Sequence, residues 1–369
     1  MIRRVEFDAL LVSLAVEAGA ELITEAEIVQ AEADATRVRL VARDGRTFEA
    51  PVVVAADGVH SVVARRLGIR AGWGASEVAL DLMEETPRAK LRDADPSTLW
   101  VAYGYEPDGG RDGGDAELDR RRAGAPKRRS GRAAEGYAYI FPKRDHVNVG
   151  IGYVLEHYRR TIEMPAYALQ RRLVDELRTR GAIEGESVRG NFTPSLIPVG
   201  GPLRQPGRGR VLLAGDAGGF VNGFTAEGIY YAMVSGELAA RSIARSGGGN
   251  QAGVAERYSR ACRDEIGAEL RDAVTLRRYL FADRRRIARI IEGAKREGAM
   301  TKLVLDFALG RLSYPALRLR FFARAPLVAG RLLWEAARTM TGTMMMLRAR
   351  SSGATIGPVR SSFEDAPGR

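Results

Sequence analysis

The chain has 369 residues, of which 45% are hydrophobic and 28% charged, a composition typical of a globular protein with two or three domains. Its net charge of +11 comes from 57 basic residues, almost all of them arginines. A single cysteine, Cys262, excludes an internal disulfide, and with only three histidines we expect no metal site. We see no signal peptide and no apolar run near the roughly 20 residues that span a bilayer, which predicts a cytoplasmic protein.

The first 72 residues predict part of a dinucleotide-type α/β domain. Apolar residues at helical spacing predict a helix over 5–19, and short β-like runs follow at 21–31, 37–42 and 47–48. The run 51–56 is typical of a buried strand. It ends at an Asp-Gly turn, and a helix is predicted over 62–67.

Residues 73–199 read mainly as antiparallel β-structure, with strands at 76–83 and 98–105, a hairpin of 136–141 with 146–153, and a helix over 164–180. The stretch 107–135 is rich in glycine and arginine and has few apolar residues, which predicts a disordered insertion. A nucleic-acid-binding role for it is disfavoured because no aromatic residues alternate with the charges. We therefore expect no nucleic acid partner.

The segment 210–219 predicts a buried strand that ends in a glycine-rich turn with one acid, Asp216. A helical pattern from Thr225 follows, so free backbone N–H groups at the helix start could hold an anion. Asp216 could accept hydrogen bonds from sugar-like hydroxyls. An ordinary strand-to-helix turn remains an alternative, and Glu227 is best read as a cap of that helix.

From Thr225 onward the chain reads as helical almost throughout, and 251–369 is predicted to be a C-terminal helical region. Within it, 302–350 combines many arginines with bulky apolar residues. This mixture fits an interfacial membrane helix, which would make the protein peripheral at the inner face of the membrane. A helical cap packed on the rest of the protein is the other reading.

Three motifs resemble those of one flavoprotein family. The glycine turn, followed by the run 227–236, resembles the second flavin-binding motif of para-hydroxybenzoate hydroxylase-like proteins, in the form found in geranylgeranyl reductases. The run 57–66 resembles the Asp-Gly motif of the same superfamily, which lies against the flavin pyrophosphate.

The third motif is an aromatic strand, 137–142, followed after seven residues by Gly-Ile-Gly at 150–152. Alternation places Tyr137, Tyr139 and Phe141 on one face, where they could form a flat apolar slot or a packed sheet core. The spacing resembles the geranylgeranyl reductase signature Tyr-x-Trp-x-Phe-Pro-x7-Gly-x-Gly. Tyr139 stands where that signature has Trp, which keeps an aromatic ring but alters the slot's width.

The resemblance implies an α/β fold: a discontinuous FAD-binding Rossmann-like domain (1–72 and 200–250), an antiparallel β-sheet substrate domain (73–199) and the C-terminal helical region. It implies FAD as cofactor, an isoprenoid lipid substrate and reduction of its C=C bonds. No catalytic residue stands out, and NADPH or ferredoxin could supply electrons. The cofactor-binding residues implied are Asp57, Gly58, Ser61, Arg65, Gly215, Asp216, Ala217, Gly218, Gly219, Thr225 and Gly228. The substrate-binding residues implied are Tyr137, Tyr139, Phe141, Pro142, Gly150 and Gly152.

One family feature is absent from this sequence. Members begin with a strand, a Gly-x-Gly-x-x-Gly turn and a helix that hold the ADP pyrophosphate. Here, residues 4–11 resemble a helix that members carry well inside the domain. We expect a late start or a truncation, and weak FAD binding by the chain as given. Two alternatives therefore remain: a flavin monooxygenase of the same superfamily, and a non-catalytic remnant with a membrane-surface role.

Overall fold

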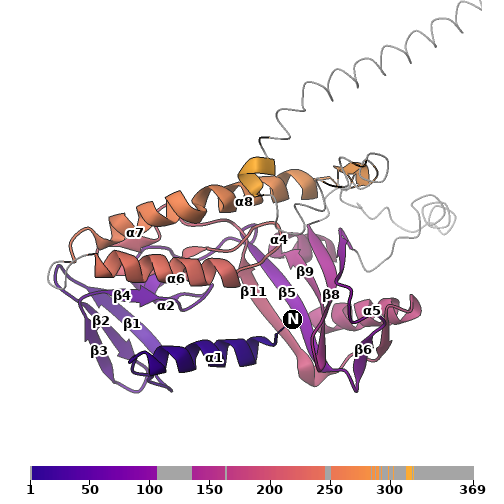
Figure 1. Cartoon of the computed structure of the whole chain (residues 1–369), viewed down its shortest axis with the longest axis horizontal. Helices are drawn as coiled ribbons and strands as arrows, with labels where there is room; N and C mark the ends of the chain where they lie inside the picture. The colour runs from indigo at the N-terminus through magenta and orange to yellow at the C-terminus, as the bar shows by residue number, and fades with distance from the viewer. Residues whose placement is uncertain are drawn as a thin grey trace, which may run out of the picture. The chain divides into compact units, whose positions relative to one another are not determined.

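The computed structural model describes residues 2–105, 135–162, 164–245 and 251–283, together with scattered residues between 285 and 319. By its internal contacts the chain divides into two units, Met1–Tyr314 and Pro315–Arg369. All the helices and strands labelled in Figure 1 belong to the first unit.

The largest sheet has five antiparallel strands in the order β11-β5-β9-β8-β7. Helix α5 (Ala166–Thr179) covers one face of it, because Leu169, Leu173 and Leu177 follow one another at helical spacing and are all buried. They meet small and branched side chains from β8 and β9, which form the core of this part. The strands are β5 (Val78–Pro87), β7 (Trp100–Tyr103), β8 (Gly136–Pro142), β9 (His146–Val154) and β11 (Phe192–Pro198).

Three smaller sheets make up the rest of the β-structure in the described part of the chain. One is a meander in the order β1-β2-β3, one pairs β10 with β6, and one has the order β12-β13-β4. In the last, β13 and β4 run parallel, and this is the only parallel pair recorded among the described strands. The strands are β1 (Ile28–Ala33), β2 (Val38–Ala42), β3 (Thr47–Ala50), β4 (Val53–Ala55), β6 (Leu91–Asp93), β10 (Ile183–Gly185), β12 (Gly207–Arg208) and β13 (Val211–Leu213).

Long helices from the second half of the chain lie along the β12-β13-β4 sheet. Helix α6 (Ile229–Ala244) packs beside α7 (Val254–Cys262), as Figure 1 shows, and both contribute to one buried cluster with Leu212 of β13. Helix α7 continues through a π-turn, η4 (Arg263–Gly267), into α8 (Ala268–Phe281). On the other face, the short helix α2 (Val62–Arg66) packs against the meander.

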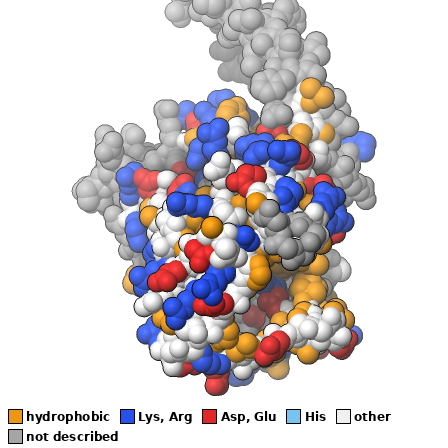
Figure 2. Space-filling view, turned by 90° about the vertical axis from the view of Figure 1, so that its left-hand side faces the viewer, with side chains coloured by type: hydrophobic (Ala, Val, Ile, Leu, Met, Phe, Trp, Pro, Cys, Tyr) orange, Lys and Arg blue, Asp and Glu red, His pale blue; other side chains and the backbone are white. Residues whose placement is uncertain are grey.

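Helix α1 (Arg4–Glu17) differs from the others because none of its residues is buried. Its apolar side chains are open, with Val5 64% and Leu14 49% exposed. Its start is held by Arg3, which forms a 2.6 Å ion pair with Glu85, the carboxylate that Lys143 also contacts. A hollow rimmed by apolar side chains is visible low on the face shown in Figure 2.

The elements expected from the sequence are largely confirmed, with three differences. The β-run expected from residue 21 begins only at Ile28, because its partner strand β2 ends at Ala42 and leaves the earlier residues unpaired. Strands β6, β10 and β12 were not expected, since two or three residues carry no readable alternation, and strand β11 was not expected either. The insertion 107–135 and the basic stretch 302–350 lie almost wholly outside the described residues. Within those residues, no helix combines the length and apolar character needed to cross a membrane.

The contrast between α5 and α1 gives a direct test of this packing. Replacing the buried Leu173 with alanine should lower the free energy of unfolding by about 2–5 kcal/mol, because it leaves a cavity under α5. The matched change Leu14→Ala, on the exposed α1, should alter it by about 0.5 kcal/mol or less. Urea unfolding measures both, and equal losses would show that α1 is buried in solution.

Candidate functional site

The two predicted flavin motifs meet at the ends of adjacent parallel strands. Strands β4 and β13 pair in register, and Ala214 donates its N–H to the carbonyl of Ala55 at 2.9 Å. The Asp-Gly motif follows β4, and the glycine turn follows β13. Because both strands point the same way, segments distant in sequence end side by side.

In the Asp-Gly motif, Asp57 and Ser61 bond to each other and to the start of α2. The Ser61 hydroxyl donates to Asp57 at 2.5 Å and accepts the Ala64 N–H, while the second Asp57 oxygen accepts the Val63 N–H. These bonds cap the helix, so neither side chain is free for other tasks. Arg65, by contrast, is exposed and has no side-chain partner among the described residues.

The glycine turn is a tight 3-10 turn over Gly215–Gly218, and it ends at Gly219 with φ of 71°. A Cβ on Gly219 would lie 2.4 Å from the Trp73 ring and 2.6 Å from the carbonyl of Gly201. Only glycine fits there, both for its backbone angle and for the close approach. The turn also buries Ala217.

Asp216 is the one acid in that turn. Burial raises the pKa of its carboxyl, and the positive charge of Arg4 opposes the rise. Its carboxylate accepts no hydrogen bond from any other described residue. A half-buried acceptor without a partner, with an arginine near it, is suited to hydroxyl groups of a ligand. The sequence alone did not single out Arg4.

A cavity of about 250 Å³ connects the two motifs. Ser61 and Arg65 line it from the Asp-Gly side, Ala217 from the glycine turn, and the Trp73 ring from the connection into β5. The motifs thus share a concave site with an available guanidinium group.

The loop 222–228 is held by Asn222, whose side-chain oxygen accepts the N–H groups of Phe224 and Thr225 and the hydroxyl of Tyr314. Helix α6 begins only at Ile229, so the expectation of a helix from Thr225 is wrong. Thr225 and Gly228 belong to the loop, because the Asn222 bonds replace helical ones. Glu227 accepts the N–H of Tyr230, which confirms its capping role.

Tyr137, Tyr139 and Phe141 share one face of β8, as expected, and their rings contact one another. The Tyr137 and Tyr139 centroids are 6.0 Å apart, and those of Tyr139 and Phe141 are 4.5 Å apart. Tyr103, Phe224 and Phe281 extend this group of rings, which we call the aromatic face. The Tyr137 hydroxyl donates to the carbonyl of Thr225 at 2.5 Å, so the aromatic face adjoins the loop after the glycine turn.

The two glycines opposite these rings differ. A Cβ on Gly150 would lie 2.4 Å from the Tyr139 ring, so Tyr139 itself fills the space above Gly150. Gly152 is more open, with Asp81 the nearest side chain at 3.8 Å from such a Cβ. Pro142 is buried where the hairpin ends, opposite Val147. Neither cavity of about 250 or 930 Å³ is lined by the aromatic residues of β8.

Asp81 is a residue that sequence reasoning missed. It lies opposite Gly152 on β5, so it shares the aromatic face, and the Tyr139 hydroxyl donates to it at 3.1 Å. Burial raises the pKa of its carboxyl to about 6, while the Tyr139 bond acts in the other direction. The alternation of Asp81, Met83 and Glu85 along β5 could have placed it there, had the pairing with Gly152 been known.

Comparison with known proteins shows that the chain is similar to FAD-binding proteins. A family model described as FAD binding domain matches residues 1–182. A digeranylgeranylglycerophospholipid reductase 2 of Methanothermobacter thermautotrophicus is 27% identical over 289 residues, which cover 76% of this chain and 64% of that protein. Protein FixC of Salmonella typhi is 30% identical over 250 residues, 65% of this chain and 53% of FixC.

Residues 1–182, just under half of the chain, therefore resemble FAD-binding domains. A geranylgeranyl bacteriochlorophyll reductase-like protein from Thermoplasma acidophilum shares its fold, with a TM-score of 0.56 at 18% identity, over 74% of this chain and 62% of that one. The expected family resemblance, the mixed α/β fold and FAD as the cofactor class are thereby confirmed. The chain spans less than two thirds of the length of each of these three proteins.

Proposed function

We propose that this chain is part of an FAD-dependent oxidoreductase that reduces C=C bonds of an isoprenoid lipid. The observation that carries the proposal is the junction of two surfaces. The paired strand ends hold the flavin motifs, and the Tyr137–Thr225 hydrogen bond ties the aromatic face to the loop that follows them. Relatives named digeranylgeranylglycerophospholipid reductase support the choice of substrate class.

The residues of the strand-end site fit FAD. Asp216 offers an unpaired acceptor for ribityl hydroxyls, and Arg65 offers a free guanidinium group for a phosphate. The backbone of the strand-end site is shaped by residues of both motifs: Asp57, Gly58, Ser61, Gly215, Gly218 and Gly219. When bound, the flavin supplies the hydride for the reduction. By this assignment, 1–72 and 200–250 form the cofactor part, and 73–199 forms the substrate part.

The aromatic face would receive the apolar chain of the substrate. Tyr139 is buried between Phe141 and Gly150, whereas Tyr137 and Phe141 are only partly buried. The neighbouring Tyr103 is 38% exposed, so the face is partly open at Tyr103. Apolar walls hold such a chain by burial and keep water from the reacting carbons. The open position at Gly152 leaves room beside Asp81.

Asp81 is the group that we assign to proton delivery. A carboxyl with a pKa of about 6 is about one-tenth protonated at pH 7 and mostly protonated below pH 6, and general acids work best when their pKa lies near the operating pH. Its proton would pass to the carbon that does not receive the hydride. Tyr139, which donates to Asp81, would set the orientation of the carboxyl.

Anaerobic turnover tests the proposed function. The chain loaded with FAD and reduced by dithionite should reoxidise when a geranylgeranyl lipid is added, with saturated product found by mass spectrometry. Reoxidation that requires oxygen and yields a hydroxylated product would instead establish a monooxygenase. A protein that takes up no FAD would establish the non-catalytic alternative.

Asp216→Ala should weaken FAD binding about tenfold, because it removes a charged acceptor of ligand hydroxyls. Titration followed by flavin fluorescence measures the affinity. The matched control is Asp264→Ala, an exposed acid in η4 away from both strand ends. Equal affinity of the Asp216 variant and the unaltered chain would remove Asp216 from the flavin site.

Asp81→Asn should lower kcat about 100-fold with little change in KM, because the amide cannot donate a proton as a carboxyl does. In the unaltered protein, kcat should fall as pH rises through about 6, since the carboxyl must be protonated. Tyr139→Phe keeps the ring but removes the hydrogen bond that lowers the pKa, so its profile should shift to higher pH. A profile that is unchanged in both variants would assign proton delivery to another group.

A further inference from the structure

A larger cavity, of about 930 Å³, lies away from the strand-end site. It is bounded by the segment 202–208 on one side and by α7, η4 and the start of α8 on the other. The Asp-Gly motif, the glycine turn and the aromatic face contribute none of their predicted site residues to its lining. Its size is within the range of small-molecule sites.

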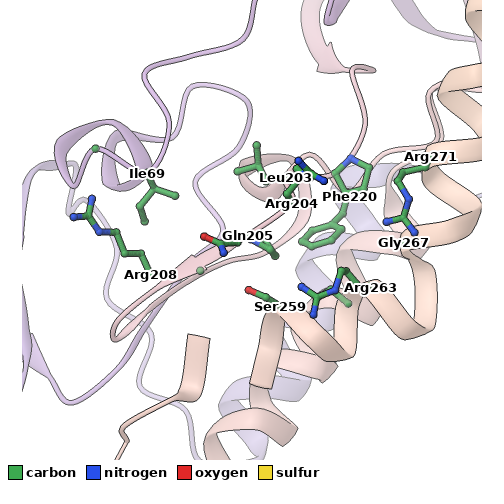
Figure 3. A pocket seen from close by; sticks show the side chains of 15 residues that line it. Ile69, Leu203, Arg204, Gln205, Arg208, Phe220, Ser259, Arg263, Gly267 and Arg271 are labelled. Carbon is green, nitrogen blue, oxygen red and sulfur yellow. The ribbon is translucent and has the colours of Figure 1, made fainter. Parts of the chain in front are cut away.

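The side chains that line this cavity carry a positive charge. Four arginines line it, Arg204, Arg208, Arg263 and Arg271, and none of the described residues that line it is acidic. Arg208 donates to the carbonyl of Leu67, whereas the guanidinium groups of Arg204, Arg263 and Arg271 have no ion pair or hydrogen bond with any described residue. Figure 3 shows the side chains of these last three gathered around the Phe220 ring.

The neighbouring residues leave space for the guanidinium groups. A Cβ on Gly267 would lie 3.0 Å from Nη1 of Arg271, so the absence of a side chain at Gly267 accommodates that arginine. Asp264 and Glu265 follow Arg263 directly in the sequence but do not line the cavity. Like charges left together without acids repel one another, and an anion between them would remove the repulsion.

We propose that this cavity binds a small molecule that carries a diphosphate group. Three unpaired guanidinium groups match the two to three negative charges of a diphosphate and can each donate two hydrogen bonds to its oxygens. Apolar walls from Ile69, Leu203 and Phe220 would receive the organic part of the ligand. That part could be a soluble nucleoside or a lipid chain. The inference is independent of the function proposed for the strand-end site.

Calorimetric titration of the full chain with inorganic pyrophosphate tests this site. Saturable binding is expected, weakened about tenfold by Arg263→Gln or Arg271→Gln and abolished by the double variant. The control is Arg260→Gln, an exposed arginine of α7 that does not line the cavity and should leave the affinity unchanged. All these side chains are exposed, so the variants should melt within a few degrees of the unaltered chain.

Three results would overturn the proposal: no saturable binding, an equal loss with Arg260→Gln, or equally tight binding of sulfate. The second would mean that the chain's net charge attracts the anion, and the third that a single anionic group suffices. Titration with ADP and with geranyl diphosphate then distinguishes the two sources. The ligand that binds more tightly shows whether the organic part is a nucleoside or a lipid chain. If neither binds more tightly than pyrophosphate, the apolar walls contribute nothing to binding.

Discussion

The parallel pairing of β4 with β13 is the constraint on which the rest of the site depends. Three apolar residues on each strand fix the register of two segments that lie far apart in the sequence. The Asp-Gly turn and the glycine turn leave these strands at the same edge. A ligand group can be contacted from two sides only because both turns lie at this edge. The parallel direction of the strands, more than any single side chain, therefore creates the site.

Packing, more than the turn residues themselves, determines the shape of this edge. The Trp73 ring lies against Gly219. The Ser235 hydroxyl of α6 accepts the N–H of Gly215 and donates to the carbonyl of Ala232. Asp57 and Ser61 are used to begin α2. Motif residues therefore divide into those that build the edge and those left free, chiefly Asp216 and Arg65. The motif sequence alone does not show which of its residues have partners in the fold and which do not.

The sequence predicted the fold class, the hairpin of β8 with β9, and the single face shared by the three β8 rings, because alternation and glycine turns are local signals. It did not predict Asp81, since that residue acquires its place only through pairing with Gly152 on another strand. Nor did it show that Tyr139 covers Gly150, which depends on a side-chain rotamer. The arginines of the large cavity come from three separate segments, and their meeting depends on how α7 lies over β12.

The π-turn η4 joins α7 and α8 into one continuous helical segment, which contacts both the parallel strands and the aromatic face. At one end Tyr258 is fixed to the carbonyl of Leu213 in β13, and at the other Phe281 stacks on Phe224, 5.5 Å away, beside the five-stranded sheet. A π-turn adds a residue to the helical repeat and so rotates everything beyond it relative to what came before. Because of this rotation, α7 and α8 can contact the parallel strands and the aromatic face with different sides of the helix. The continuous helical segment α7–η4–α8 therefore contacts β13 through Tyr258 and the aromatic face through Phe281.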